Sequence, residues 1–146
     1  MVKTFSEGMV AFPSLKWKFV VLLVVIDQLT KALAFSLGSF KLLPFFSIAP
    51  VVNTGTVFGF FQGSNLFFIL LTLLLLCAVF YFSLKEPVLS LGFTLIFAGG
   101  AGNLLDRLFH GYVLDFLQVS FFSVFNLADV FVVVGVFVNI FLLVKK

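Results

Sequence analysis

The chain has 146 residues, of which 62% are hydrophobic and 10% are charged, and its mean hydropathy is +1.28. Soluble domains are closer to half apolar and a quarter charged, so this composition excludes an ordinary soluble fold and predicts that lipid surrounds much of the surface. The net charge of +3 does not indicate nucleic-acid binding, because the basic residues lie at the ends of apolar segments rather than along one stripe.

Four apolar stretches predict an all-α membrane protein with four transmembrane helices. One bilayer crossing needs about 20 apolar residues, so four crossings nearly fill a chain of this length. We therefore expect a single integral-membrane domain over residues 1–146. The predicted spans cover residues 17–37, 66–84, 88–105 and 121–144.

The loop after the first span, Gly38–Asn65, carries a pattern typical of strands. Val51-Val52 and Thr56-Val57-Phe58 are short β-favouring runs, and Asn53-Thr54-Gly55 between them is a turn signal. This pattern predicts a small extracytoplasmic β element in the first outer loop, resting on the membrane surface.

The distribution of basic residues predicts how the chain is oriented. Six lysines fall on one side of four spans, whereas the other side has Lys41, Arg107 and, at most, Lys31. Cytoplasmic loops carry the excess of positive charge, so both termini are expected in the cytoplasm and the loops at 38–65 and 106–120 outside. The six lysines are Lys3, Lys16, Lys18, Lys85, Lys145 and Lys146.

The first span also has some features of a cleavable signal peptide. A basic start and an apolar core from Phe19 to Ile26 precede the small-residue site Ala32-Leu33-Ala34. Asp27 and Lys31 lie just before that site and argue against cleavage, so we interpret the segment as a retained span.

The four aspartates all lie inside or beside predicted spans. Asp27 lies within the first span, Asp106 closes the third, Asp115 lies in the connection that follows, and Asp129 lies about one turn inside the fourth. A carboxylate deep in a bilayer costs roughly 2.5–3.5 kcal/mol on insertion scales, so such residues usually face a polar interior and have a function. Because the third span runs outward and the fourth runs back, the last three aspartates are expected together near the outer leaflet boundary.

Two asparagines accompany these aspartates at helical spacing. Asn103 precedes Asp106 by three residues and Asn126 precedes Asp129 by three, which on a helix places both members of a pair on one face. Two neighbouring carboxylates share a proton, so that one activates a water as base while the other acts as acid. Asparagine amides hold the carboxylates and donate to developing negative charge. This is aspartic-protease chemistry, which needs no metal and no cofactor.

Other chemistries fit the residues less well. A zinc site needs several His and Cys ligands, whereas the chain has one of each, His110 and Cys77, far apart in sequence. A serine protease would depend on His110, and no Gly-x-Ser-x-Gly elbow accompanies it. Intramembrane aspartates also serve proton relays and ion pathways, so the residues alone leave a transporter or channel subunit open.

Five polar blocks follow one another over most of the chain. They are Asp27-Gln28-Leu29-Thr30-Lys31, Asn53-Thr54-Gly55-Thr56-Val57-Phe58, Gly99-Gly100-Ala101-Gly102-Asn103-Leu104-Leu105-Asp106-Arg107, Val113-Leu114-Asp115-Phe116 and Phe125-Asn126-Leu127-Ala128-Asp129. In this order they resemble the blocks Asp-x-x-Ser/Thr-Lys, Asn-x-Gly-x-x-Phe, Gly-Asn-x-x-Asp-Arg, Val-x-Asp-Phe and Phe-Asn-x-Ala-Asp of lipoprotein signal peptidase, or signal peptidase II. Each block alone is weak evidence for the resemblance, whereas five blocks in this order on four spans are specific evidence for it.

The resemblance implies an intramembrane aspartyl endopeptidase with Asp115 and Asp129 as its catalytic pair. Its implied substrates are membrane-anchored prolipoproteins whose lipobox cysteine already carries diacylglycerol, cleaved just before that cysteine. It also implies a monomer in the bacterial cytoplasmic (inner) membrane that contacts membrane lipid and binds globomycin-type inhibitors. Residues implied to support the site or line the substrate path are Asn103, Asp106, Arg107, Asn126, Asp27, Lys31, Asn53 and Gly55.

The chain departs from the family pattern in a few places, and some residues have simpler local interpretations. Thr56 and Val57 stand where smaller residues are expected, and the Asp115–Asp129 connection is short, which puts substrate gripping in question more than the chemistry. The residues leave open whether Lys31 pairs with Asp27 or snorkels to the interface, and whether Asp106 and Arg107 form only a local ion pair. They also leave open whether Asn53 is only a turn residue.

Overall fold

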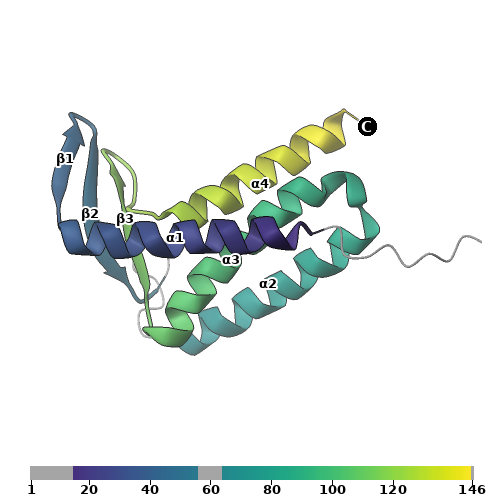
Figure 1. Cartoon of the computed structure of the whole chain (residues 1–146), viewed down its shortest axis with the longest axis horizontal. Helices are drawn as coiled ribbons and strands as arrows, with labels where there is room; N and C mark the ends of the chain where they lie inside the picture. The colour runs from purple at the N-terminus through teal and green to yellow at the C-terminus, as the bar shows by residue number, and fades with distance from the viewer. Residues whose placement is uncertain (1–14, 56–63, 146) are drawn as a thin grey trace, which may run out of the picture.

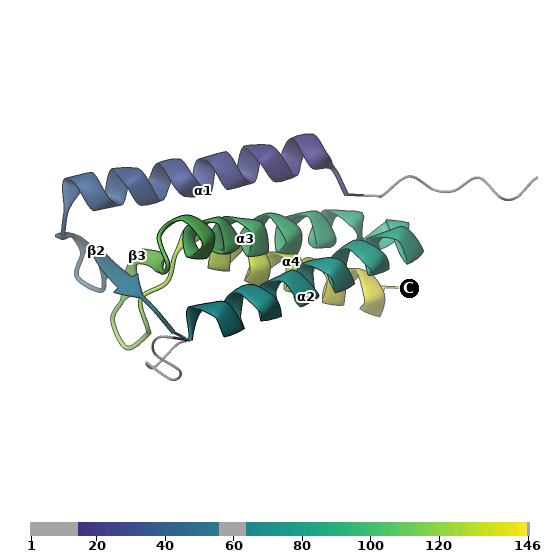
Figure 2. The same ribbon diagram turned by 90° about the horizontal axis from the view of Figure 1, so that it is seen from below.

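Four helices that are long and apolar enough to cross a membrane form the body of the computed structural model, which describes residues 15–55 and 64–145. They lie side by side, with a small sheet at one end (Figures 1 and 2). In chain order the elements are α1 (Trp17–Leu37), β1 (Phe40–Leu43), β2 (Phe46–Asn53), α2 (Asn65–Lys85), the 3-10 turn η2 (Pro87–Leu89), α3 (Ser90–Phe109), β3 (Val113–Val119) and α4 (Leu127–Val144).

The structure confirms the four predicted spans and corrects the start of the fourth. α1 has the predicted bounds, and α2 is one residue longer than predicted at each end. α3 begins at Ser90 rather than at residue 88 and ends at Phe109 rather than at residue 105. α4 begins at Leu127 rather than at residue 121. Residues 121–126 are apolar enough to resemble part of a span, but Phe121 lies in a turn, Phe125 pairs with Leu117 of β3 and Asn126 caps the helix.

The helices bury few of their apolar side chains within the bundle. A small core of Val20, Leu23 and Ala98 holds α1 against α3, whereas residues such as Leu29 and Leu74 are about two-thirds exposed, at 64% and 67%. This is the surface expected of helices whose outer faces contact lipid. Close packing of α3 on α4 depends on Gly99, because a Cβ there would overlap the backbone of Ala128.

The sheet of the described residues has three antiparallel strands in the order β1–β2–β3. β1 and β2 confirm the predicted β element in the loop between the first two spans, and Val51-Val52 lies in β2. The predicted strand material at residues 56–58 lies outside the described residues. β3 comes from the connection between α3 and α4 and was not predicted, because its partner strand is some 60 residues earlier: Asp115 pairs with Val51.

The start of α4 lies beside the middle of α1. Asp27 is the eleventh of the 21 residues of α1, and its Oδ1 accepts a hydrogen bond of 2.9 Å from the backbone N–H of Ala128. The ten residues of α1 after Asp27 therefore rise about 15 Å beyond the first turn of α4. The sheet lies beside this half of α1, with strands that cross the helix axes (Figure 1).

Candidate active site

Asp115 lies on β3 with its carboxylate held between two asparagine amides. Asn53, the last residue of β2, donates from Nδ2 to Asp115 Oδ2 at 2.8 Å, and Asn126 donates from Nδ2 to Asp115 Oδ1 at 2.7 Å. The Asn53 Oδ1 also accepts from the N–H of Gly55 at 3.0 Å. Asn53 is therefore both the predicted turn residue and a contact of the site.

Asp129 lies in the first turn of α4, which corrects the expectation that it lies one turn inside the span. Asn126 is the N-cap of this helix and forms a reciprocal capping box with Asp129. The Asp129 N–H donates to Asn126 Oδ1 at 3.0 Å, and the Asn126 N–H donates to Asp129 Oδ2 at 3.1 Å. The helix N-terminus favours negative charge at this position.

Two asparagines connect the carboxylates to each other. Asn103 on α3 donates from Nδ2 to Asp129 Oδ1 at 2.8 Å, and its Oδ1 accepts from Asn126 Nδ2 at 3.1 Å. Asn126 thus contacts both Asp115 and Asp129 and is completely buried. The predicted meeting of two Asn-x-x-Asp pairs needs correction: Asn126 and Asp129 form a cap rather than a helix face, and Asp106 points away to α1.

The surroundings of Asp115 favour its protonated form. The pKa of this carboxyl is raised from 3.8 to about 6, because burial and the nearby Asp129 charge together outweigh the amide donors of Asn53 and Asn126, which lower it. The side chain is close to fully buried. A carboxyl with this pKa exchanges its proton near neutral pH, as an acid–base catalyst must.

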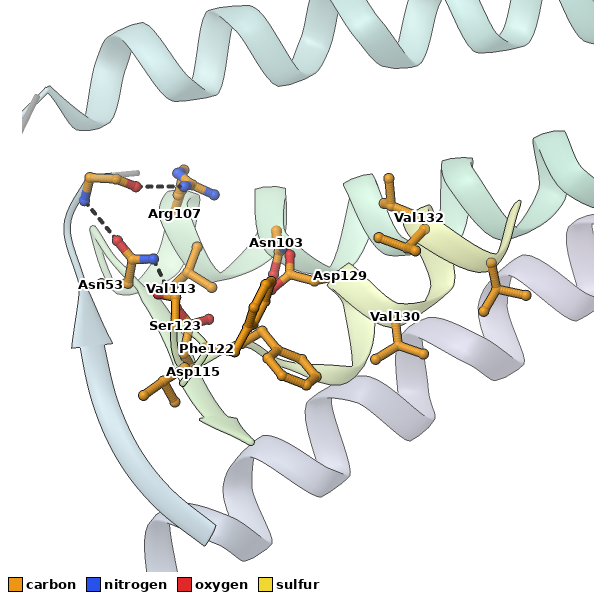
Figure 3. A pocket seen from close by; sticks show the side chains of 15 residues that line it. Asn53, Asn103, Arg107, Val113, Asp115, Phe122, Ser123, Asp129, Val130 and Val132 are labelled. Carbon is orange, nitrogen blue, oxygen red and sulfur yellow. Dashed lines mark hydrogen bonds between the residues drawn. The ribbon is translucent and has the colours of Figure 1, made fainter. Parts of the chain in front are cut away.

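Both carboxylates face one cavity of about 590 Å³ (Figure 3). Its polar end is formed by the two aspartates with Asn53, Gly55, Asn103 and Arg107. Its remaining wall is apolar and follows α4 and the segment before it, with Phe122, Val130, Val132, Val133 and Val134 among the lining residues. The sequence did not single out this apolar wall, because valines and phenylalanines are common throughout the spans.

Arg107 reaches the polar end of the cavity from the last turn of α3. Its Nη2 donates to the Gly55 carbonyl at 3.5 Å, and its guanidinium lies over the Phe68 ring at 5.2 Å from the centroid. Within residues 15–55 and 64–145 both ion pairs belong to Lys31, so the local pair between Asp106 and Arg107 is not formed.

A second polar cluster lies behind Asn103, on the side of α1. The Lys31 ammonium lies 2.8 Å from Asp27 Oδ2, 2.7 Å from Asp106 Oδ2 and 3.1 Å from Asn103 Oδ1. Of the two interpretations that the sequence left open for Lys31, the structure therefore shows the pair with Asp27. Lys31 does not extend to the membrane interface, because it is only 4% exposed. Gln28, which sequence reasoning missed, donates to Asp106 Oδ1 at 2.9 Å. The sequence feature that could have identified Gln28 is its position next to Asp27 in the first polar block.

The two residues of the rejected chemistries lie away from this cavity. Cys77 is exposed on α2, and His110 is exposed at the end of α3, against Tyr112. Among residues 15–55 and 64–145, no group of three His, Cys, Asp or Glu side chains is arranged to hold a metal ion.

Fold and site together define a multi-pass membrane protein in which two aspartates and two asparagines, Asp115, Asp129, Asn53 and Asn103, line one cavity. The family model described as "Signal peptidase (SPase) II" matches residues 19–145, and the chain belongs to this family.

Relatives named lipoprotein signal peptidase match over most of their length. The chain is 40% identical to that of Caldanaerobacter subterraneus subsp. tengcongensis, covering 87% of this chain and 94% of the relative. It is 35% identical to that of Staphylococcus aureus (strain Newman), covering 86% and 85%. A solved structure titled "Bacterial membrane enzyme structure by the in meso method at 2.3 A resolution" superposes with a TM-score of 0.81 at 32% identity, covering 88% and 87%.

Proposed function

We propose that this chain is an aspartyl endopeptidase that removes the signal peptide from diacylglyceryl-modified prolipoproteins, cutting just before the lipidated lipobox cysteine. The observation that carries the proposal is the placement of Asp115 and Asp129 on one cavity, joined through Asn126. Membership of the signal peptidase II family supports the same reaction. The chemistry uses side chains alone, and we expect no cofactor.

The two aspartates divide the acid and base roles in this proposal. Asp129 is the base, because the N-terminus of α4 and the N–H donors of Asn103 and Asn126 favour its anion. Asp115 is the acid, because its pKa of about 6 leaves a far larger protonated fraction near neutral pH than an ordinary aspartate has.

The proposed reaction proceeds through a tetrahedral intermediate. Asp129 takes a proton from a water whose oxygen attacks the scissile carbonyl carbon, while Asp115 gives its proton to the carbonyl oxygen. Asp129 then protonates the amide nitrogen, the C–N bond breaks, and Asp115 recovers a proton from a hydroxyl of the intermediate. The signal peptide leaves with a new carboxyl terminus and the lipoprotein keeps a free amino group on its cysteine.

The shape of the cavity suits a substrate that arrives from the bilayer. Its valine-lined wall along α4 would accept apolar chain or lipid, and its polar end would receive the peptide bond where the signal helix ends. Globomycin-type inhibitors are proposed to occupy the same cavity.

We also propose that the chain is a monomeric, single-domain protein of the bacterial cytoplasmic membrane with both termini in the cytoplasm. The start of α1, the turn between α2 and α3 and the end of α4 lie at one end of the bundle (Figure 2). Lys16, Lys18, Lys85 and Lys145 mark that end, as the positive-inside rule requires of a cytoplasmic side. The site then opens toward the outer leaflet.

The direct test is cleavage of a diacylglyceryl-modified lipobox peptide by the purified protein in detergent, beside the unlipidated peptide. We expect a cut before the modified cysteine only, and no product from Asp115→Asn or Asp129→Asn protein that elutes and melts like the parent. Turnover by either variant would overturn the assignment of the pair. Equal cleavage of the unlipidated peptide would overturn the lipid requirement while leaving the peptidase in place.

A further inference from the structure

The end of the sheet farthest from Asn53 and Asp115 presents a group of exposed apolar side chains. We call this group the apolar tip: Leu42, Leu43, Phe45, Phe121 and Phe122. Leu43 ends β1, Phe45 lies in the turn from β1 to β2, and Phe121 belongs to the connection from β3 to α4. The two turns lie side by side, because the Ser120 N–H donates to the Phe45 carbonyl at 2.9 Å and Phe46 pairs with Val119.

These side chains are unusually exposed for segments outside the helices. Phe45 is 60% exposed, Phe122 is 68% exposed and Phe121 is fully exposed at 107%. Residues 42–46 and 119–125 contain no charged side chain. Phe121 also has a left-handed backbone with φ of 72°, which is uncommon for a bulky residue and turns its ring outward. Contiguous apolar patches on a protein surface mark contacts with other proteins or with membranes.

The position of the tip along the bundle identifies lipid as its partner. α4 begins beside the middle of α1, so the sheet lies at the height of the second half of α1. In that half Leu29, Leu33 and Phe35 are 64%, 57% and 66% exposed, which is the lipid-facing surface of a span. Figure 1 shows the β1–β2 end of the sheet projecting to the side of α4, beyond the first turn of that helix. The apolar tip therefore lies at the same height as the lipid-facing side chains of the second half of α1, beyond the start of α4.

We infer that the apolar tip is inserted into the lipid of the leaflet nearest the aspartates, so that the sheet is held in the membrane rather than standing in water above it. Lys41, exposed on β1 just before the tip, is placed to reach lipid phosphates while its stem stays in apolar surroundings. Because β3 carries Asp115, a tip seated in lipid also fixes the depth of that carboxylate. This inference depends on the exposed apolar tip and on its height along the membrane-spanning helices. It does not depend on the proposed peptidase activity.

Tryptophan fluorescence in vesicles tests this placement, because Trp17 is the only tryptophan of the chain. Phe121→Trp is introduced into a Trp17→Phe background, and the full-length protein is reconstituted in phosphatidylcholine–phosphatidylglycerol vesicles. Quenching is measured with lipids brominated on acyl carbons near the headgroup and, separately, with aqueous iodide. Leu33→Trp in the same background is the lipid-facing reference, and N-acetyltryptophanamide in buffer is the aqueous reference.

The expected result is lipid quenching comparable with that of Leu33→Trp and iodide quenching several-fold weaker than that of the aqueous reference. Strong iodide quenching without lipid quenching would place the tip in water and overturn the inference. Protection from both quenchers would place a protein surface, such as a second copy of the chain, over the tip and would overturn it equally. Phe45→Trp on the neighbouring turn provides a second probe, which decides the matter if the Phe121 variant does not fold.

Discussion

Two pairs of carboxylates lie inside this bundle, and the chain holds them in different ways. Asp27 and Asp106 share the ammonium of Lys31, at 2.8 and 2.7 Å. Asp115 and Asp129 instead accept hydrogen bonds from neutral groups, the amides of asparagines and one backbone N–H. One pair contacts a buried ammonium directly, whereas the direct contacts of the other pair are with neutral groups.

We propose that this difference separates a structural role from a catalytic one. The Lys31 ammonium offsets part of the negative charge of its two carboxylates, and Asp27 also holds α4 against α1 through the N–H of Ala128. Neutral donors fix the position of a carboxylate without removing its tendency to take a proton in a buried site. The pair between amides is therefore the pair suited to move protons. Asn103 contacts both regions, through Lys31 and Asp129.

The largest expected effect comes from removing charge at the reactive pair. Asp129→Asn and Asp115→Asn should each lower turnover at least about a thousandfold, because neither amide can exchange the required proton. Asp27→Asn makes the same chemical change in the structural pair and keeps an oxygen that can accept from Ala128. It should lower thermal stability while the folded enzyme still turns over. An inactive but well-folded Asp27→Asn protein would break the comparison.

The next largest effect is on stability and concerns Lys31. Lys31→Met leaves Asp27 and Asp106 buried without their cation, which should cost about 3–5 kcal/mol of folding free energy. Lys41→Met is the matched control, because Lys41 is exposed on β1 and its loss should change stability by no more than about 0.5 kcal/mol. Thermal unfolding in detergent measures both, and equal melting temperatures for the two variants would show that the buried pair contributes nothing.

The structural and reactive pairs were predictable from the sequence to different degrees. Hydropathy predicted the four spans, and the order of the blocks predicted that Asp115 and Asp129 lie together; their catalytic roles stay predictions. The dual pairing of Lys31 was not predictable, because Asp106 is 75 residues away and local spacing pointed only to Asp27. The late start of α4 was also missed, because the hydropathy of Phe121 and Phe122 is typical of a span and hydropathy does not identify Asn126 as an N-cap. β3 was missed because its partner strand is distant in sequence.

A smaller effect is expected where the two regions meet. Asn103→Leu removes the donor to Asp129 and the acceptor of Lys31 together. A hydrogen bond to a charged group contributes about 1.5–3 kcal/mol, so we expect turnover to fall about 10- to 100-fold with little change in KM. Asn65→Leu is a control at a similar amide, which bonds the Arg107 carbonyl instead. Equal losses in both variants would mean that Asn103 acts on the fold and not on Asp129.

The smallest effect is a displacement of the pH profile, and it tests which aspartate holds the proton. The pKa of Asp115, about 6 against an ordinary 3.8, means that the folded protein binds this proton more tightly than the unfolded chain. The stability that this proton contributes is therefore present below about pH 4 and is lost as the pH rises through about 6.

If protonated Asp115 is the acid, turnover should decline above about pH 6. Asn53→Ala removes a donor that favours the carboxylate, so it should move that alkaline limb upward by about one pH unit. An unmoved limb, from protein that is still active, would assign the proton to Asp129 and exchange the two roles.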